Sequence, residues 1–318
     1  MGTFRLWSDE IEAMRADARA VIEASQASMM LQPKPSPDLP RDEQIEHARQ
    51  SMVVVTFPIP EAEEREIGGV PCRIIRPDGA PRAIYLHFHG GGMISGSAAV
   101  MDIPNQMTAK EHGVAVVSVE YRKAPEFPWP AGPDDGVAVA RELLGAVGAE
   151  LGSDRLLMGG ESAGGYMAAA VALRVRDELG AIERVLGLNL SYGVHDWSGN
   201  ASQLGRRATD DFDVLSPDFM RLAIECYVPG RTDGERRAPE ISPAYADLHG
   251  LPPCFISVGT ADHLLDDSLM FASRAAAAGV SVDLHVLPEL SHAFQMFDCE
   301  MTRHWFAAHS AWMAARLG

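Results

Sequence analysis

The amino-acid sequence predicts an α/β fold in which helices cover both faces of a mostly parallel sheet. Beyond Met52, short apolar runs alternate with longer segments of helical periodicity, an order typical of βαβ units. The runs are apolar at nearly every position, which indicates strands buried on both faces. We expect these strands at residues 83–88, 114–120, 155–160, 185–190, 254–259 and 281–287.

The N-terminal segment has a different pattern. Apolar residues recur at helical spacing from Ile11 to Met29, and acidic residues stand near the start, where they complement the helix dipole. Four prolines then lie between Pro33 and Pro40. Because proline lacks a backbone donor and fixes φ, it excludes a continuous helix through this stretch. We expect an amphipathic helix followed by an extended connection.

The composition excludes several classes of protein. Of the 318 residues, 47% are hydrophobic and 22% charged, which is ordinary for a globular protein with a sizeable core. The formal net charge of −17 would repel phosphate backbones and anionic lipid headgroups, so we expect no nucleic-acid or membrane partner. Charges interrupt the N-terminal residues every few positions, and no run reaches membrane-spanning length. A cytoplasmic location is therefore expected.

The four cysteines show neither the paired spacing of metal ligands nor the density of a disulfide scaffold. They are Cys72, Cys226, Cys254 and Cys299. We expect them to be reduced packing residues.

A Gly-x-Ser-x-Gly pattern, Gly160 to Gly164, follows the strand expected at 155–160, and an Ala-rich run that favours a helix comes after it. The glycines permit a tight, strained turn that lifts the serine hydroxyl clear of the sheet. Ser162 is therefore the predicted nucleophile. A glycine-rich turn that merely packs a helix could also contain a serine, so the strand-turn-helix context carries the prediction. Glu161 is assigned no role.

A second glycine-rich segment, His89 to Met93, follows the strand expected at 83–88. Consecutive glycines leave N–H groups free to point at a developing negative charge. We predict that Gly91 and Gly92 donate to this oxyanion, together with the N–H of Ala163. A phosphate-binding loop is the alternative, but it needs a helix start and usually a lysine or a spaced acid, which this segment lacks.

A serine at neutral pH needs a base, and the base needs an orienting carboxylate. Of three aspartates that follow the strand at 254–259, Asp262 lies nearest the strand end and is the predicted acid. Asp266 and Asp267 are interpreted as caps or first-turn charges of the next helix. His292, on the loop after the strand at 281–287, is the predicted base. The chain order Ser, Asp, His is that of α/β-hydrolases.

From about Val70 to its end, the sequence resembles the bacterial hormone-sensitive-lipase-like esterases. The resemblance rests on HGGGM from His89, YRKAPEFPWPAGPDD from Tyr121, GESAGG from Gly160 and ISPAYADLHGLPPCFISVGTADHLLDD from Ile241. It implies an α/β-hydrolase fold with a mostly parallel eight-stranded sheet and a helical cap. Residues 1–50 would form an N-terminal helical cap segment and residues 51–318 the catalytic domain, with about 192–240 contributing further cap helices.

Three positions depart from the pattern of that family. Lys123 replaces the commoner leucine, Glu161 replaces an aspartate, and the loop before His292 lacks the usual glycine. These departures leave the predicted chemistry intact. The segment from Tyr121 to Asp135 is interpreted as a Pro-rich turn that seats the following helix, rather than as a loop that shapes the site.

The resemblance implies hydrolysis of esters with short-to-medium acyl groups, and dimers are common in the family, so a homodimer is a possible state. The triad chemistry requires neither a metal nor an organic cofactor. Candidate substrate contacts are Met93, Tyr192 and Trp197, together with Met30. Packing is an alternative role for the two aromatic residues and for Met30.

Two other functions remain open at this point. An amidase or formamidase could use the same triad, since acyl transfer does not by itself distinguish the leaving group. The second alternative is a non-catalytic small-molecule receptor on this fold, as plant hormone receptors of similar sequence imply. Such receptors usually lack the triad histidine, whereas His292 is present.

Overall fold

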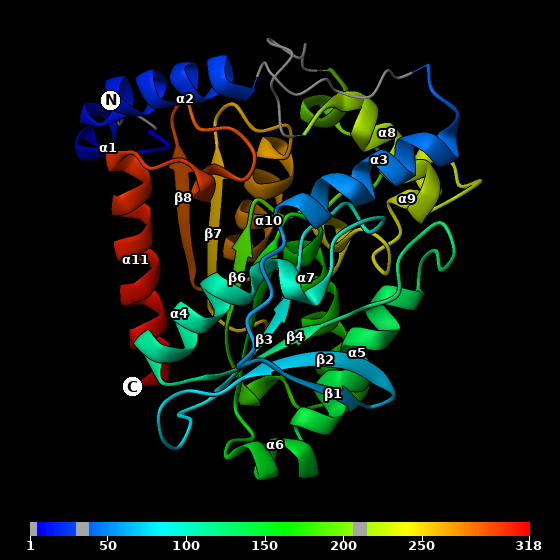
Figure 1. The fold of residues 1–318 in the computed structure, drawn as a ribbon, viewed down its shortest axis with the longest axis vertical. Coiled ribbons are helices and arrows are strands. Elements are labelled where there is room, and N and C mark those ends of the chain that lie inside the picture. Colours follow the sequence, from blue (N-terminus) through cyan, green and yellow to red (C-terminus); the bar gives the residue numbers. More distant parts are fainter. Residues whose placement is uncertain (1–4, 30–37, 206–214) are drawn as a thin grey trace.

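The computed structural model describes residues 5–29, 38–205 and 215–318, so Met30 lies outside the described residues. Its centre is a sheet of eight strands in the order β1-β2-β4-β3-β5-β6-β7-β8 (Figure 1). The strands are β1 Glu63–Ile67, β2 Val70–Ile75, β3 Ile84–Phe88, β4 Ala115–Val119, β5 Leu156–Glu161, β6 Val185–Ser191, β7 Cys254–Gly259 and β8 Val282–Leu287. From β4 to β8 in this order all pairs are parallel, whereas β1–β2 and β2–β4 are antiparallel. The predicted fold class is therefore confirmed.

Two hydrophobic clusters cover the two faces of the sheet, because neighbouring residues on a strand point to opposite sides. On β3, Leu86 belongs to one cluster and Tyr85 to the other. Helices α5 (Ala131–Leu143), α7 (Ala163–Arg174) and α10 (Leu265–Ala277) pack on the first face, with α6 (Ala146–Leu151) beside α5. Helices α4 (Asp102–His112) and α11 (Glu300–Leu317) pack on the second.

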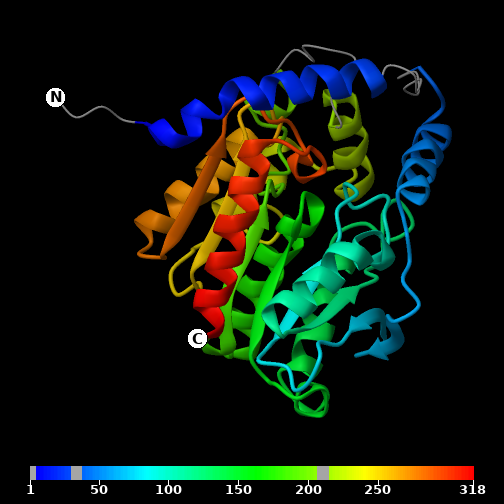
Figure 2. The ribbon, with the colours of Figure 1, turned by 60° about the vertical axis from the view of Figure 1, so that its left-hand side comes forward.

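Three helices form the N-terminal segment: α1 (Asp9–Ala13), α2 (Arg15–Met29) and α3 (Arg41–Val54). The expected amphipathic helix is interrupted at Met14, and α3 continues four residues beyond the predicted boundary at 50. Helices α8 (Pro217–Tyr227) and α9 (Asp233–Arg236) lie within the stretch expected to add cap helices. Figures 1 and 2 show α2, α3 and α8 at one end of the molecule. The division into cap and catalytic domain stays a prediction.

Short helical turns complete the described elements. They are Ala98–Met101, Val175–Leu179, Ile182–Arg184, Ala201–Gly205, Pro243–Tyr245 and Phe294–Met296. Within the described ranges, none of the helices combines the length and the apolar character that a membrane crossing requires. All four cysteines are buried and unbridged, as predicted for packing residues.

The register of the sheet brings the motif-bearing loops together. Phe88 of β3 pairs with Gly160 of β5, so the glycine-rich loop and the turn containing Ser162 leave the sheet side by side. Gly259 of β7 pairs with Leu287 of β8, which places the loops of Asp262 and His292 next to each other. Loops beyond the carboxyl ends of parallel strands are where open α/β sheets place their sites.

Candidate active site

The turn between β5 and α7 holds Ser162 in a conformation that L-residues rarely adopt. Its φ is 57° and its ψ is −119°, and its N–H donates to the carbonyl of Ser191 (2.9 Å). A Cβ atom added to Gly160 or Gly164 would lie 2.1 Å or 1.9 Å from the carbonyl oxygen of Phe88. The two glycines are therefore required by the close approach of β3, and the predicted strained turn is present.

Ser162, His292 and Asp262 meet beyond the carboxyl ends of the strands, although they are far apart in the chain. The Nε2 atom of His292 lies 2.9 Å from Ser162 Oγ, and its Nδ1 atom lies 2.9 Å from Asp262 Oδ2 and 3.1 Å from Oδ1. Asp262 is fully buried and also accepts a hydrogen bond from the N–H of Leu264 (2.8 Å). The ring of Tyr192 packs edge-on against the imidazole, with centroids 4.7 Å apart.

This geometry determines which nitrogen of the neutral imidazole carries the proton. An ionised carboxylate only accepts hydrogen bonds, so the proton of neutral His292 belongs on Nδ1, facing Asp262. Nε2 then presents its lone pair to the hydroxyl of Ser162. The arrangement can remove the hydroxyl proton and return it to a leaving group.

The loop after β3 passes beside this serine, because a Cβ atom added to Gly90 would lie 3.6 Å from Ser162 Cβ. Gly91 and Gly92 have φ values of 125° and 62°. The carbonyl of Gly91 accepts hydrogen bonds from the N–H groups of Ile94 (3.1 Å) and Ser95 (3.0 Å) and from Ser95 Oγ (2.9 Å), which fixes the orientation of the peptide. Among the loop and turn hydrogen bonds between described backbone groups, none uses the N–H of Gly91, Gly92 or Ala163. These donors are available to a developing oxyanion.

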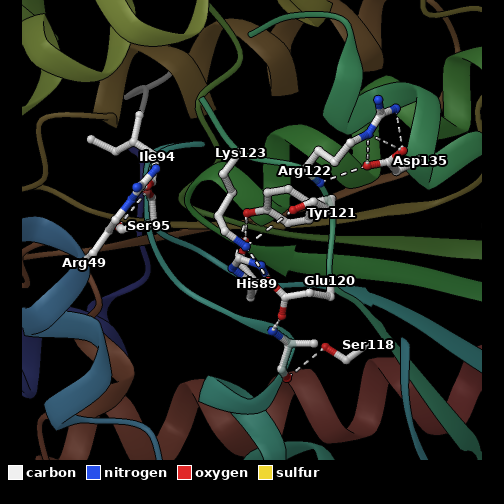
Figure 3. A network of polar contacts seen from close by, with 12 residues as sticks. Arg49, His89, Ile94, Ser95, Ser118, Glu120, Tyr121, Arg122, Lys123 and Asp135 are labelled. Atoms are coloured by element: carbon white, nitrogen blue, oxygen red, sulfur yellow. Dashed lines mark hydrogen bonds and ion pairs between the residues drawn. The ribbon is translucent and has the colours of Figure 1, made fainter. Parts of the chain in front are cut away.

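A buried network supports this loop from behind (Figure 3). The hydroxyl of Tyr121 donates to the carbonyl of His89 (2.7 Å), and the two rings stack with centroids 4.2 Å apart. Burial lowers the pKa of His89 to about 3, so its ring is neutral at ordinary pH. Lys123 pairs with Glu120, which also accepts a hydrogen bond from the N–H of Ala98 (2.6 Å). Lys123, which replaces the commoner leucine, thus has a charged partner in Glu120.

The segment from Tyr121 to Asp135 seats α5, as predicted. Asp135 accepts hydrogen bonds from the N–H of Arg122 (2.8 Å) and from its guanidinium Nη2 (2.7 Å), which joins the start of the segment to the first turns of the helix (Figure 3).

Three candidate substrate contacts fall within the described residues. Met93 and Trp197 have no exposed surface and belong to the hydrophobic core. Trp197 packs against the rings of Tyr166 (5.4 Å) and Tyr227 (4.6 Å). Tyr192 is nearly buried and contacts His292. The structure shows packing at these positions, and a role in substrate binding stays a prediction.

The interpretation of Asp266 and Asp267 as caps or first-turn charges of α10 is confirmed in its second form. Both lie in the first turn, but their carboxylates bind the loop that follows β6. Asp267 accepts hydrogen bonds from the N–H groups of His195 and Asp196, each 2.8 Å long, and Asp266 from that of Ser202 (3.0 Å). Contacts across 64 or more positions of the chain leave no local sequence pattern.

Sequence reasoning missed Phe219 of α8, which lies over the glycine-rich loop. A Cβ atom on Gly92 would lie 2.8 Å from the Phe219 ring and 3.4 Å from the side chain of Ala223. The Ser216-Pro217 pair begins this helix, and the Ser216 hydroxyl accepts the N–H of Phe219 (3.1 Å). That signal could have located the helix, but not the loop that it covers.

Within the described part of the chain, no group of three or more His, Cys, Asp or Glu side chains is arranged to hold a metal ion.

Comparisons with known proteins agree with the fold. A family model described as the alpha/beta hydrolase fold matches residues 85–296. The chain is 36% identical over 251 residues to Carboxylesterase NlhH of Mycobacterium tuberculosis, covering 74% of this chain and 76% of that protein. A solved hormone-sensitive lipase from a metagenome library has a TM-score of 0.79 and 33% identity, covering 95% of this chain and 99% of its own. A hyperthermophilic esterase from the archaeon Pyrobaculum calidifontis has a TM-score of 0.82 and 26% identity, covering 93% and 97%.

Proposed function

Since this chain belongs to the α/β-hydrolase family and is a serine carboxylesterase of the hormone-sensitive-lipase-like group, we propose that Ser162, His292 and Asp262 are its catalytic triad. The proposed substrates are carboxylic esters with short-to-medium acyl groups, hydrolysed through an acyl-enzyme intermediate. The observation that carries the proposal is the continuous hydrogen-bonded line from Ser162 Oγ through both nitrogens of His292 to Asp262.

In the first half of the reaction, Ser162 Oγ attacks the ester carbonyl carbon while its proton moves to His292 Nε2. The resulting imidazolium is stabilised by Asp262. When the tetrahedral intermediate collapses, the bond from the carbonyl carbon to the alcohol oxygen breaks and His292 donates its proton to that oxygen. The alcohol leaves, and the acyl group remains on Ser162.

In the second half, water takes the place of the serine hydroxyl. His292 removes a proton from the water as it attacks the acyl carbonyl, and then returns the proton to Ser162 Oγ as the acid is released. Both tetrahedral intermediates carry a negative oxygen. We assign its stabilisation to the N–H groups of Gly91, Gly92 and Ala163, each of which is worth about 3 kcal/mol in the transition state.

Rapid mixing with p-nitrophenyl acetate tests the proposal. The unaltered protein should release a burst of about one p-nitrophenolate per active site, followed by slower turnover. Ser162→Ala should abolish the burst and the turnover, because it removes the hydroxyl that lies 2.9 Å from His292 Nε2. A burst of normal size in Ser162→Ala would overturn the assignment of the nucleophile.

A second experiment defines the acyl group. Turnover should be measured on p-nitrophenyl esters of increasing chain length, with the matching p-nitroanilides in parallel. We expect kcat/KM to be highest for the shorter esters and far lower for the anilides. Faster hydrolysis of the anilides would instead support an amidase.

A further inference from the structure

The loop that carries His292 is held in a strained conformation. It runs from the end of β8 to the start of α11, and two of its residues, Glu289 (φ 67°) and Ala293 (φ 59°), adopt left-handed backbone without being glycine. Such a conformation is unfavourable for a residue with a side chain and persists only where surrounding contacts impose it. The position of the imidazole therefore depends on what holds this loop.

One set of contacts comes from the neighbouring loop of Asp262. The N–H of Glu289 donates to Thr260 Oγ1 (3.0 Å), and the carbonyl of Leu290 accepts the N–H of Ala261 (3.0 Å). These bonds fix the backbone before His292. They leave the Glu289 side chain to make contacts of its own.

That side chain is held by the N-terminal helix α2. Arg15 Nε donates to Glu289 Oε1 (2.6 Å), and Arg19 Nη2 donates to the same oxygen (2.9 Å). The hydrogen bond from Arg19, together with that from Arg15, holds the pKa of Glu289 below its ordinary value although burial acts in the opposite direction. The carboxylate is thus ionised at neutral pH and lies between two permanent cations.

Helix α2 also holds the far end of the same loop. Asp17 Oδ2 accepts the N–H of Glu300 (2.7 Å), the first residue of α11, where a carboxylate complements the helix dipole. Beneath these polar contacts, Ala18 belongs to the same hydrophobic cluster as Leu290 and Phe294. Figure 2 shows α2 crossing the end of α11, and the orange-red loop lies below it.

From these contacts, and on the basis of the catalytic role proposed for His292, we propose that Arg15, Arg19 and Asp17 are positioning residues that hold the His292 loop in its reactive geometry. They act through Glu289 and Glu300 and do not touch the substrate. The N-terminal helix therefore sets the turnover number of the enzyme. A misplacement of about 1 Å in a catalytic group can lower the rate by about 100-fold.

The test compares Arg15→Ala/Arg19→Ala with Arg65→Ala. Arg65 is on β1, at the edge of the sheet opposite β8. It forms an ion pair with Glu150 through two hydrogen bonds of 2.7 Å and 2.8 Å. For each variant, kcat and KM should be measured on p-nitrophenyl acetate, with active sites counted from the burst so that unfolded protein does not contribute.

We expect the double alanine variant to lose about 10- to 100-fold in kcat per active site with KM little changed. Arg65→Ala should keep its kcat, and Arg15→Lys/Arg19→Lys should keep most of it, because the charges remain. Glu289→Gln gives the same test from the other partner if the double variant folds poorly. If the double alanine variant and Glu289→Gln both kept their kcat per active site and only their melting temperature fell, the positioning role would be overturned. That result leaves the triad untouched, since the triad stands or falls with Ser162→Ala.

Discussion

The Nδ1 atom of His292 lies 2.9 Å from Oδ2 of Asp262, a carboxylate without exposed surface. A buried acceptor at this distance selects the imidazole tautomer whose Nε2 lone pair faces Ser162. The loops that carry the two side chains follow neighbouring strands in register, so the sheet itself imposes the contact.

Replacing Asp262 by Asn should lower kcat by about 10⁴-fold with little change in KM. The amide keeps the size of the carboxylate, but its NH₂ group can donate to Nδ1 and so favours the tautomer with a proton on Nε2. Steady-state kinetics on p-nitrophenyl acetate at neutral pH measures the change. Activity within tenfold of the unaltered enzyme would transfer the role of the acid to another carboxylate.

Replacing Gly92 by Ala should lower kcat by about 100-fold, the loss typical of one misplaced oxyanion donor. The new Cβ atom would lie 2.8 Å from the ring of Phe219, at a φ of 62°. Gly180→Ala is the matched control, because Gly180 has a φ of 59° and no atom within 4 Å of the added Cβ. Adding Phe219→Ala to the Gly92 variant should restore part of kcat. Equal kinetics for the two glycine variants would argue against the oxyanion role.

Replacing His195 by Leu should stabilise the protein, and more so in acid. Within the described residues neither ring nitrogen of His195 has a hydrogen-bond partner, and burial lowers its pKa from 6.5 to about 3. Between these values the unfolded chain binds more protons than the native one, so stability is unaffected above pH 6.5 and is lost as the pH falls toward 3.

Urea unfolding at pH 7 and pH 5 checks this effect. The leucine variant should gain about 2 kcal/mol over the unaltered protein at pH 5, beyond any difference at pH 7. A gain of the same size at both pH values would show that His195 does not titrate in this way.

Replacing Ala293 by Gly should raise the free energy of unfolding by up to about 1 kcal/mol, because glycine relieves the strain of its left-handed backbone at φ 59°. Ala278→Gly is the control. Its φ is −81°, so glycine there only adds freedom to the unfolded chain and should destabilise. A loss of stability in both variants would mean that the backbone at Ala293 is not strained.

Much of the fold could be predicted from local patterns, and the reasons are physical. All six apolar runs are strands, and the residues directly after four of them form the candidate site. Five of these strands are largely buried on both faces as expected, whereas β8 lies at the edge of the sheet and is only partly buried. The first two strands were not predicted, because β1 is an exposed edge strand with four charged residues among its five. Gly68 and Gly69, both with positive φ, join β1 to β2 in a two-residue turn and were the available signal.

The supporting contacts could not be predicted in the same way. Arg15 and Glu289 are 274 positions apart, and Phe219 reaches Gly92 from a helix whose docking depends on the whole fold. Trp197 was a candidate substrate contact with packing as the alternative, and only the folded structure shows that its ring packs against two tyrosines. Local periodicity identifies elements, whereas these contacts arise only when the elements assemble.

Mass spectrometry of the intact protein, acid-quenched during turnover of p-nitrophenyl butyrate, tests the central claim most directly. The account predicts a population heavier by one butyryl group, with the modification on the peptide that contains Ser162, and no such population in Ser162→Ala. Turnover without any acylated protein, or an acyl group on a different residue, would contradict it.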